Sequence, residues 1–209
     1  MTHPALLRCP TCGLHQKLCV CAKLPQLVLP IQIIVVQHAR ELHKPSNTGR
    51  LVHKLFKNSI LLSYGVKDQT FNTKPLQDSK TDYYVLFPKR SATVVNKKFL
   101  KQRKGRKIAF VLLDGTWSQA ARMSHRVPYV KDFPFVSFSK NIATQWGVRQ
   151  AVESSRLCTL EAAIYWVENC YGSQKALPLK RIFKHVRDRH FLTKRRVNPF
   201  VSHYKARAV

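Results

Sequence analysis

The sequence predicts an α/β fold with a mostly parallel sheet and helices on both faces, because strand-like and helix-like segments alternate along the chain. The runs 31–36 and 107–113 are almost entirely apolar, which is typical of strands buried on both faces. The chain has 209 residues, of which 44% are apolar, and this suffices for one good-sized domain with a small appendage.

The first half of the chain contains three expected strands and one helix. Strands at 31–36 and 58–63 flank a helix near 51–56, where the apolar residues form one helical stripe. A third strand at 83–87 ends at Pro88, which has no N–H to donate to a neighbouring strand.

The second half continues the alternation. Strands are expected at 107–113 and, more weakly, at 133–138, and helices at 118–124, 160–171 and 178–193. Asp114-Gly115 ends the strand at 107–113, and Gly172 ends the helix at 160–171.

The charge balance points to an anionic partner. Lys and Arg number 37 and Asp and Glu only 10, so the formal net charge is +27, and nucleic acid is the commonest partner of such a protein. The longest uncharged stretch, 24–39, is too short to span a bilayer, and the N-terminus lacks the apolar run of a signal peptide. We therefore expect a cytoplasmic, monomeric protein without membrane association.

Two basic stretches carry most of the local charge excess. Residues 97–107 contain seven Lys or Arg, and residues 175–209 contain eleven against one Asp. The second stretch interleaves aromatic residues such as Phe183 and Tyr204, which suits phosphate contacts combined with base stacking. The alternative is a merely solvated basic face.

Four of the six cysteines form a Cys-x2-Cys-x6-Cys-x-Cys pattern at Cys9, Cys12, Cys19 and Cys21. Two close pairs separated by a short loop can place four thiolates at the corners of a tetrahedron, as Zn²⁺ requires in a structural site. His15 could replace one ligand. An iron–sulfur cluster and four unrelated reduced thiols are the alternatives.

The loop after the first strand has the composition of an anion site. Asn47 or Thr48 can cap the following helix, and Gly49 lets the backbone approach a ligand. The residues expected to contact a ligand are Lys44, Ser46, Asn47, Thr48, Gly49 and Arg50. Their positive charge and the N–H groups of the helix start suit phosphate or carboxylate. The alternative is a capped helix beside a solvated basic loop.

A second candidate segment, Asp114-Gly115-Thr116-Trp117, follows the strand 107–113 directly. Ligands of open α/β sheets bind at the carboxyl ends of the strands, and Asp114 is one of few acids. Trp117 could stack on a base. Alternatively, Asp114 caps the next helix through N–H groups and Trp117 belongs to the core.

A third segment runs from Arg149 to the helix start near residue 160. Thr159 is the expected helix cap, and Glu161 lies in the first turn, where the helix dipole favours an acid. Arg149 and Arg156 could bind carboxylate or phosphate, and an acid here could hold a substrate ammonium.

These motifs together resemble the DTW-domain family. The resemblance rests on five segments in order, and the family's Asp-x-Thr-Trp signature is Asp114 to Trp117 here. The segments are CPTCGLHQKLCVC, ELHKPSNTGRL, LFP at 86–88, LLDGTWSQAARM and the stretch from Arg149 to LCTLEAA. One departure is Cys158, where the family often has Ser.

The resemblance implies a tRNA-uridine aminocarboxypropyltransferase. Such enzymes transfer the 3-amino-3-carboxypropyl group of S-adenosylmethionine to N3 of a tRNA uridine, in the variable loop for bacterial members, and release 5′-methylthioadenosine. The family is also similar to SPOUT-type proteins, which implies a Rossmann-like sheet and allows a C-terminal knot. We expect a zinc-binding element at 1–24 and a catalytic α/β domain at 25–209.

For this reaction we expect the following roles of residues. Asp114 would act as general base on uridine N3 or anchor the donor amino group, together with Thr116 and Trp117. Donor contacts are expected from Lys44, Ser46, Asn47, Thr48, Gly49, Arg50, Phe87, Pro88, Asp114, Gly115, Trp117, Arg149, Thr159 and Glu161. An RNA methyltransferase using the same donor and a non-catalytic zinc-containing RNA-binding protein remain alternatives.

Overall fold

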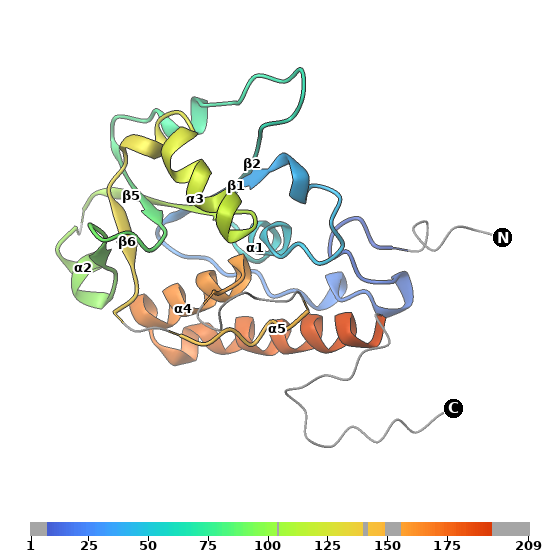
Figure 1. The fold of residues 1–209 in the computed structure, drawn as a ribbon. Coiled ribbons are helices and arrows are strands. Elements are labelled where there is room, and N and C mark those ends of the chain that lie inside the picture. Colours follow the sequence, from blue (N-terminus) through green and yellow to red (C-terminus); the bar gives the residue numbers. More distant parts are fainter. Residues whose placement is uncertain (1–7, 104, 140–141, 149–155, 194–209) are drawn as a thin grey trace.

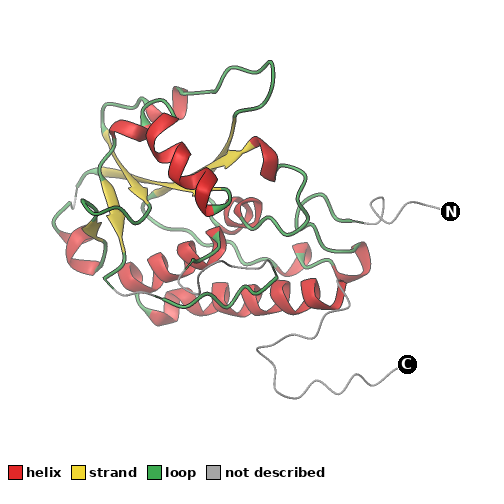
Figure 2. Ribbon diagram, in the orientation of Figure 1, coloured by secondary structure: helices red, strands yellow, loops and turns green. Residues whose placement is uncertain are grey.

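The computed structural model describes residues 8–103, 105–139, 142–148 and 156–193, which form a sheet with helices on both faces (Figures 1 and 2). The strands are β1 (Gln32–His38), β2 (Ser59–Tyr64), β3 (Thr81–Leu86), β4 (Thr93–Val94), β5 (Lys107–Asp114) and β6 (Phe135–Ser137). The helices are α1 (Gly49–Leu55), α2 (Lys97–Lys101), α3 (Trp117–Arg126), α4 (Thr159–Tyr171) and α5 (Ser173–Thr193).

The six strands lie in the order β2-β1-β5-β3-β6-β4, and every pair of neighbours is parallel. This confirms the predicted α/β class and its parallel sheet. The central strands are buried on both faces because their side chains alternate between two separate apolar cores. Ile33 and Leu112 enter one core, and Ile34 and Leu113 enter the other.

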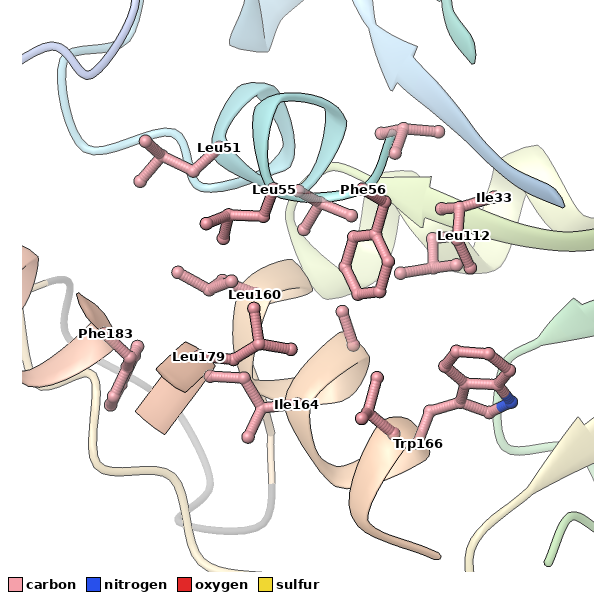
Figure 3. Packing of buried hydrophobic residues seen from close by; sticks show 14 of the residues in the cluster. Ile33, Leu51, Leu55, Phe56, Leu112, Leu160, Ile164, Trp166, Leu179 and Phe183 are labelled. Atoms are coloured by element: carbon pink, nitrogen blue, oxygen red, sulfur yellow. The ribbon is translucent and has the colours of Figure 1, made fainter. Parts of the chain in front are cut away.

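The larger core lies between the sheet and the layer formed by α1, α4 and α5 (Figure 3). Leu55, Leu160 and Leu179 meet there, and the indole of Trp166 packs on Phe110 with ring centroids 4.8 Å apart. The smaller core lies under α3, which contributes Ala120 and Met123. Helices therefore cover both faces, as the sequence predicts.

Several boundaries differ from the prediction. The short strand β4 and the helix α2 were not expected: β4 has only two residues, and α2 lies in a stretch whose charge hides any periodicity. Helix α5 begins at Ser173 rather than near 178, and Pro178 lies inside it. The helix before it ends at Gly172 as predicted, and Gly172 has a φ of 91°, in the region that favours glycine.

The Cys-rich segment is packed against the rest of the chain. Cys12, Leu14 and Val20 are buried in the same core as Leu51 and Val52 of α1. The expected division at residue 24 and the C-terminal knot stay predictions, and residues 194–209 lie outside the described part. None of the described helices is both long and apolar enough to cross a bilayer.

Candidate functional site

The site lies at the carboxyl edge of the sheet, between the neighbouring strands β1 and β5. Strand β1 leads to α1 on one face of the sheet, and β5 leads to α3 on the other, so the two connections diverge. Such a switch point opens the crevice in which doubly wound α/β proteins bind ligands. Gln37 and Asp114 pair in register at this edge, and both side chains are buried.

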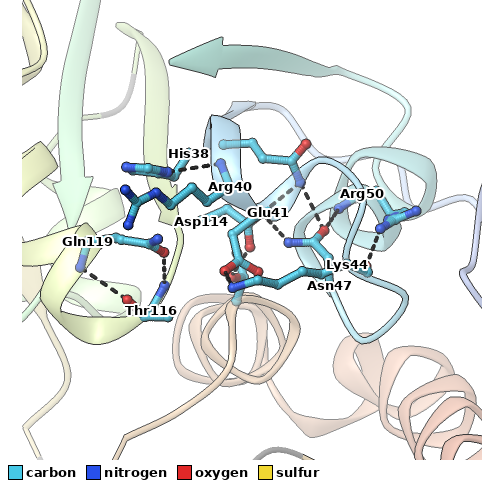
Figure 4. Close-up of polar contacts among 11 residues, drawn as sticks. His38, Arg40, Glu41, Lys44, Asn47, Arg50, Asp114, Thr116 and Gln119 are labelled. Atoms are coloured by element: carbon cyan, nitrogen blue, oxygen red, sulfur yellow. Dashed lines mark hydrogen bonds and ion pairs between the residues drawn. The ribbon is translucent and has the colours of Figure 1, made fainter. Parts of the chain in front are cut away.

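Asp114 is the centre of the polar network at this edge (Figure 4). Its Oδ2 accepts hydrogen bonds from the side-chain amides of Gln37 at 2.8 Å and Asn47 at 2.6 Å. Its Oδ1 accepts one from the Thr159 hydroxyl at 2.6 Å. A carboxylate that is only 2% exposed thus joins the ends of β1, the following loop and the start of α4.

Gly49 is required by the position of this carboxylate. A Cβ atom at residue 49 would lie 2.3 Å from Cγ and 2.4 Å from Oδ2 of Asp114. The glycine therefore permits a close approach, as predicted, and the approaching group is a side chain of the protein itself. Two residues share the capping of α1. Thr48 occupies the N-cap position, and the Asn47 side chain accepts a hydrogen bond at Oδ1 from the Arg50 N–H at 3.2 Å.

The helix that follows Asp114 is capped by Thr116. The Thr116 N–H donates to the Gln119 side chain at 2.7 Å, and the Gln119 N–H donates to the Thr116 hydroxyl at 3.3 Å. This reciprocal capping box satisfies the helix start without Asp114. The alternative interpretation of Asp114 as a cap is therefore wrong, and its carboxylate is used in the network described above.

The predicted cap of α4 is also wrong by one residue. Cys158 is the N-cap, and its N–H donates to the Glu161 carboxylate at 2.8 Å. Thr159 is the first residue of the helix. Its hydroxyl does not cap the helix but donates to Asp114. Burial, followed by the nearby Glu161 carboxylate, raises the pKa of the Cys158 thiol well above its ordinary value.

Glu161 organises the wall of the crevice. Its carboxylate also accepts from the Thr144 hydroxyl at 2.7 Å and from the Gln145 N–H at 2.5 Å. The side chain is only 3% exposed, so it holds the segment 144–146 against α4 rather than reaching outward.

Two adjoining cavities open at this edge. The first, of about 300 Å³, is mainly apolar and includes Phe87, Pro88 and Phe138 in its lining. The second, of about 270 Å³, has more polar residues in its lining, Asp114 among them, and we name it the polar cavity. Both cavities are lined by Gly115, Trp117, Leu157, Cys158 and Thr159.

Trp117 stands at the boundary between the two cavities. Its ring centroid lies 5.6 Å from that of Phe87, and the Arg156 guanidinium carbon lies 5.8 Å from the Trp117 ring centroid. The indole is half-buried and lines both cavities, so it offers an aromatic surface to a ligand.

Most of the predicted site residues meet here. Those that line a cavity are Ser46, Asn47, Thr48, Phe87, Pro88, Asp114, Gly115, Thr116, Trp117 and Thr159. Lys44, Gly49, Arg50 and Glu161 lie behind the wall: Lys44 Nζ pairs with the buried Glu41 at 2.6 Å, and the Arg50 guanidinium donates to main-chain carbonyls. Arg149 lies outside the described residues.

The structure adds residues that were not predicted as ligand contacts. Gln37 holds Asp114, and Thr144 and Trp146 line the polar cavity beside Arg156, which the sequence already indicates as a contact for carboxylate or phosphate. Gln37 could have been predicted by the pattern that indicated Asp114, a polar side chain at the end of a buried strand. Thr144 and Trp146 lie in a segment without periodicity, and they could not be found in this way.

The four predicted cysteines do converge. The Sγ atoms of Cys9, Cys12, Cys19 and Cys21 all lie within 4.8 Å of one another. The Cys9–Cys21 and Cys12–Cys19 distances are 3.6 and 3.8 Å, and a regular tetrahedron with Zn–S bonds of about 2.3 Å has edges of about 3.8 Å. The donor set therefore fits zinc. The His15 Nδ1 accepts from the Lys17 N–H and caps a short turn.

The thiols of this cluster differ in acidity. Burial raises the pKa of Cys12 and of Cys21. Burial acts in the same direction on Cys9, but the N–H groups of Cys12 and Thr11 stabilise its thiolate and bring its pKa down to about 6. Thiolates are the form that binds metal.

Comparison with known proteins gives one match that covers most of the chain. A protein-family model described as DTW domain matches residues 6–191. The matched range contains the Cys cluster, the Asp114 network and both cavities. No solved structure matches the chain.

Proposed function

Since the chain belongs to the DTW-domain family, we propose that it is a tRNA-uridine 3-amino-3-carboxypropyltransferase that uses S-adenosylmethionine. Membership of this family is consistent with tRNA modification. The proposed product is a uridine of the tRNA variable loop that carries the aminocarboxypropyl group on N3, and 5′-methylthioadenosine leaves.

The observation that carries this proposal is the pair of adjoining cavities that share Trp117. The donor has an aromatic, weakly polar adenosyl part and a charged amino acid part. The apolar cavity with Phe87 and Pro88 suits the former, and the polar cavity with Asp114 suits the latter. The sulfonium would then lie near the boundary, beside the indole face, which attracts cations.

Asp114 has capacity for one further contact. A carboxylate has about four lone-pair directions, and three are occupied by Gln37, Asn47 and Thr159. The remaining direction, on Oδ1, can accept the uridine N3 proton as general base or a hydrogen bond from the donor ammonium. The three neutral donors fix the orientation of the carboxylate in either role.

The transfer balances without another reactant. The proton leaves uridine N3, a bond forms between N3 and the donor Cγ, and the Cγ–S bond breaks with its electron pair going to sulfur. The sulfonium becomes a neutral thioether, so the site mainly orients the two partners. Arg156 and the Ser46 and Thr48 hydroxyls are the proposed contacts of the donor carboxylate.

Zinc has a structural role in this proposal. The four cysteines would hold it with no position open for water, and such a site stabilises the fold around it. No step of the transfer depends on the metal.

The test uses bulk tRNA from cells that lack the gene, incubated with purified protein and S-adenosylmethionine. Mass spectrometry of the nucleosides should find a uridine heavier by one aminocarboxypropyl group, with an equal amount of methylthioadenosine. A methylated nucleoside with S-adenosylhomocysteine would move the assignment to a methyltransferase. An unchanged tRNA that still binds would indicate a non-catalytic RNA-binding protein.

A further inference from the structure

The exposed side of α3 is basic in its C-terminal half. Arg122, His125 and Arg126 are exposed there, and the helix sequence WSQAARMSHR contains no acid. The first two residues of the helix, Trp117 and Ser118, line the polar cavity. With a rise of about 1.5 Å per residue, the helix carries this charge to about 12 Å from the cavity mouth.

One further cation, Arg40, lies near this helix, after the end of β1. Arg40 is exposed in the short turn Ala39–Glu41, next to His38. Burial lowers the pKa of His38, and the positive charges of Arg40 and Arg122 lower it further, so the three side chains lie near one another. Figure 4 shows His38 and Arg40 on the side of the Asp114 network where Thr116 and Gln119 begin α3.

Among the described residues, the three acids of the site are buried. Glu41, Asp114 and Glu161 are at most 3% exposed and are engaged with protein groups. Asp132 is exposed, but it lies beyond the C-terminal end of α3. The net charge of +27 attracts a polyanion, and the cations exposed here are open to contact with it.

The stretch 97–107 has a higher density of Lys and Arg in the sequence, but its cations are less open to a ligand. Arg106 forms a bidentate pair with Asp82, and the Arg103 guanidinium bonds the Tyr84 hydroxyl and lies 3.8 Å from the Phe99 ring centroid. Two of the cations in this stretch, Arg103 and Arg106, thus interact with other residues of the protein.

We propose that Arg40, Arg122, His125 and Arg126, which we name the α3 face, bind the phosphate backbone of the RNA beside the nucleotide that enters the polar cavity. This inference rests on the proposed function, since it takes the substrate to be tRNA. It locates the binding surface on α3 and not on the stretch 97–107.

The test compares two double variants that remove the same charge from exposed helix positions. Arg122→Ala with Arg126→Ala alters the α3 face, and Lys97→Ala with Lys98→Ala alters α2. Binding of fluorescent tRNA is measured over a series of salt concentrations, and methylthioadenosine binding is measured by calorimetry. Circular dichroism and thermal unfolding check that each variant is folded.

We expect the α3 variant to bind tRNA about tenfold more weakly, with the slope of log K against log salt reduced by up to about 2, as for two lost phosphate contacts. The α2 variant should stay within about twofold of the parent. Equal losses in both variants, or a loss confined to the α2 variant, would overturn the inference. If the parent binds tRNA but modifies no nucleoside, the proposed reaction fails while the comparison of variants still decides the inference.

Discussion

The guanidinium of Arg50 donates a hydrogen bond from Nη1 to the main-chain carbonyl of Pro10 at 3.1 Å, and so joins α1 to the Cys cluster. Its Nη2 donates to the carbonyl of Lys44, at the start of the loop that lines the polar cavity. Gly13 reinforces this junction, because a Cβ atom there would lie 2.1 Å from the Pro45 carbonyl oxygen. The Cys-rich segment therefore braces one wall of the site.

Replacing Arg50 by Ala should loosen the loop 44–48 while the metal stays bound. Hydrogen exchange of peptides covering this loop should become faster, and peptides from β3 should be unchanged. The Michaelis constant for the donor should rise about tenfold with a smaller change in kcat, because Asp114 and Trp117 remain in place. Loop exchange equal to that of the parent, with zinc content equal too, would contradict this role.

Replacing Asp114 by Asn should stop transfer and cost stability. The amide oxygen can still accept from Gln37 and Asn47 while its NH₂ group faces the Thr159 hydroxyl, but neutral hydrogen bonds then replace charge-assisted ones, at a cost of about 1–3 kcal/mol. Loss of a general base lowers the rate by about 10²- to 10⁴-fold. Nucleoside analysis checks the rate, and urea unfolding checks the stability.

Thr159→Val is the matched control, since it removes one hydrogen bond to Asp114 and keeps the carboxylate. It should retain measurable transfer. An Asp114→Asn variant as active as this control would remove Asp114 from the chemistry.

Replacing Gly49 by Ala should displace the Asp114 carboxylate, because the new methyl group would overlap it. Overpacking of this kind costs about 1–3 kcal/mol, and transfer should fall with it. Gly65→Ala is the control: its φ of 75° also strains a substituted residue, but a Cβ there meets nothing within 4 Å. The control should lose some stability and keep its specific activity.

The sequence predicted those parts of the site that depend on local pattern. The strand that ends at Asp114 and the cysteine pairs are visible as an apolar run and a spacing, and the structure has both. The sequence predicts Thr159 as the cap of α4, and only the tertiary contact with Asp114 shows that its hydroxyl is used elsewhere. The strand β4 consists of two exposed residues, whose pairing with β6 has no signature in the sequence.

Stability should fall on the acid side of neutrality through His53. Burial lowers the pKa of His53 in the folded protein, and the neighbouring Lys54 lowers it further. The folded state thus favours the neutral ring, so this stabilisation is present above the unfolded pKa of about 6.5 and is lost as the pH falls below it. The free energy of unfolding, measured in urea at pH 7.5 and 5.5, should decrease less in His53→Gln than in the parent.

Replacing Glu161 by Gln tests whether the wall of the polar cavity depends on its carboxylate. The Thr144 hydroxyl, the Gln145 N–H and the Cys158 N–H all donate to it, so an amide would set its own NH₂ group against a donor. The segment 144–146 should then detach from α4, and the Michaelis constant for the donor should rise while tRNA binding stays unchanged. Glu168→Gln is the control, because that carboxylate pairs with Lys180 on the outer side of α4 and lines neither cavity. Equal donor constants in the two variants would mean that Glu161 acts only on the stability of the helix start.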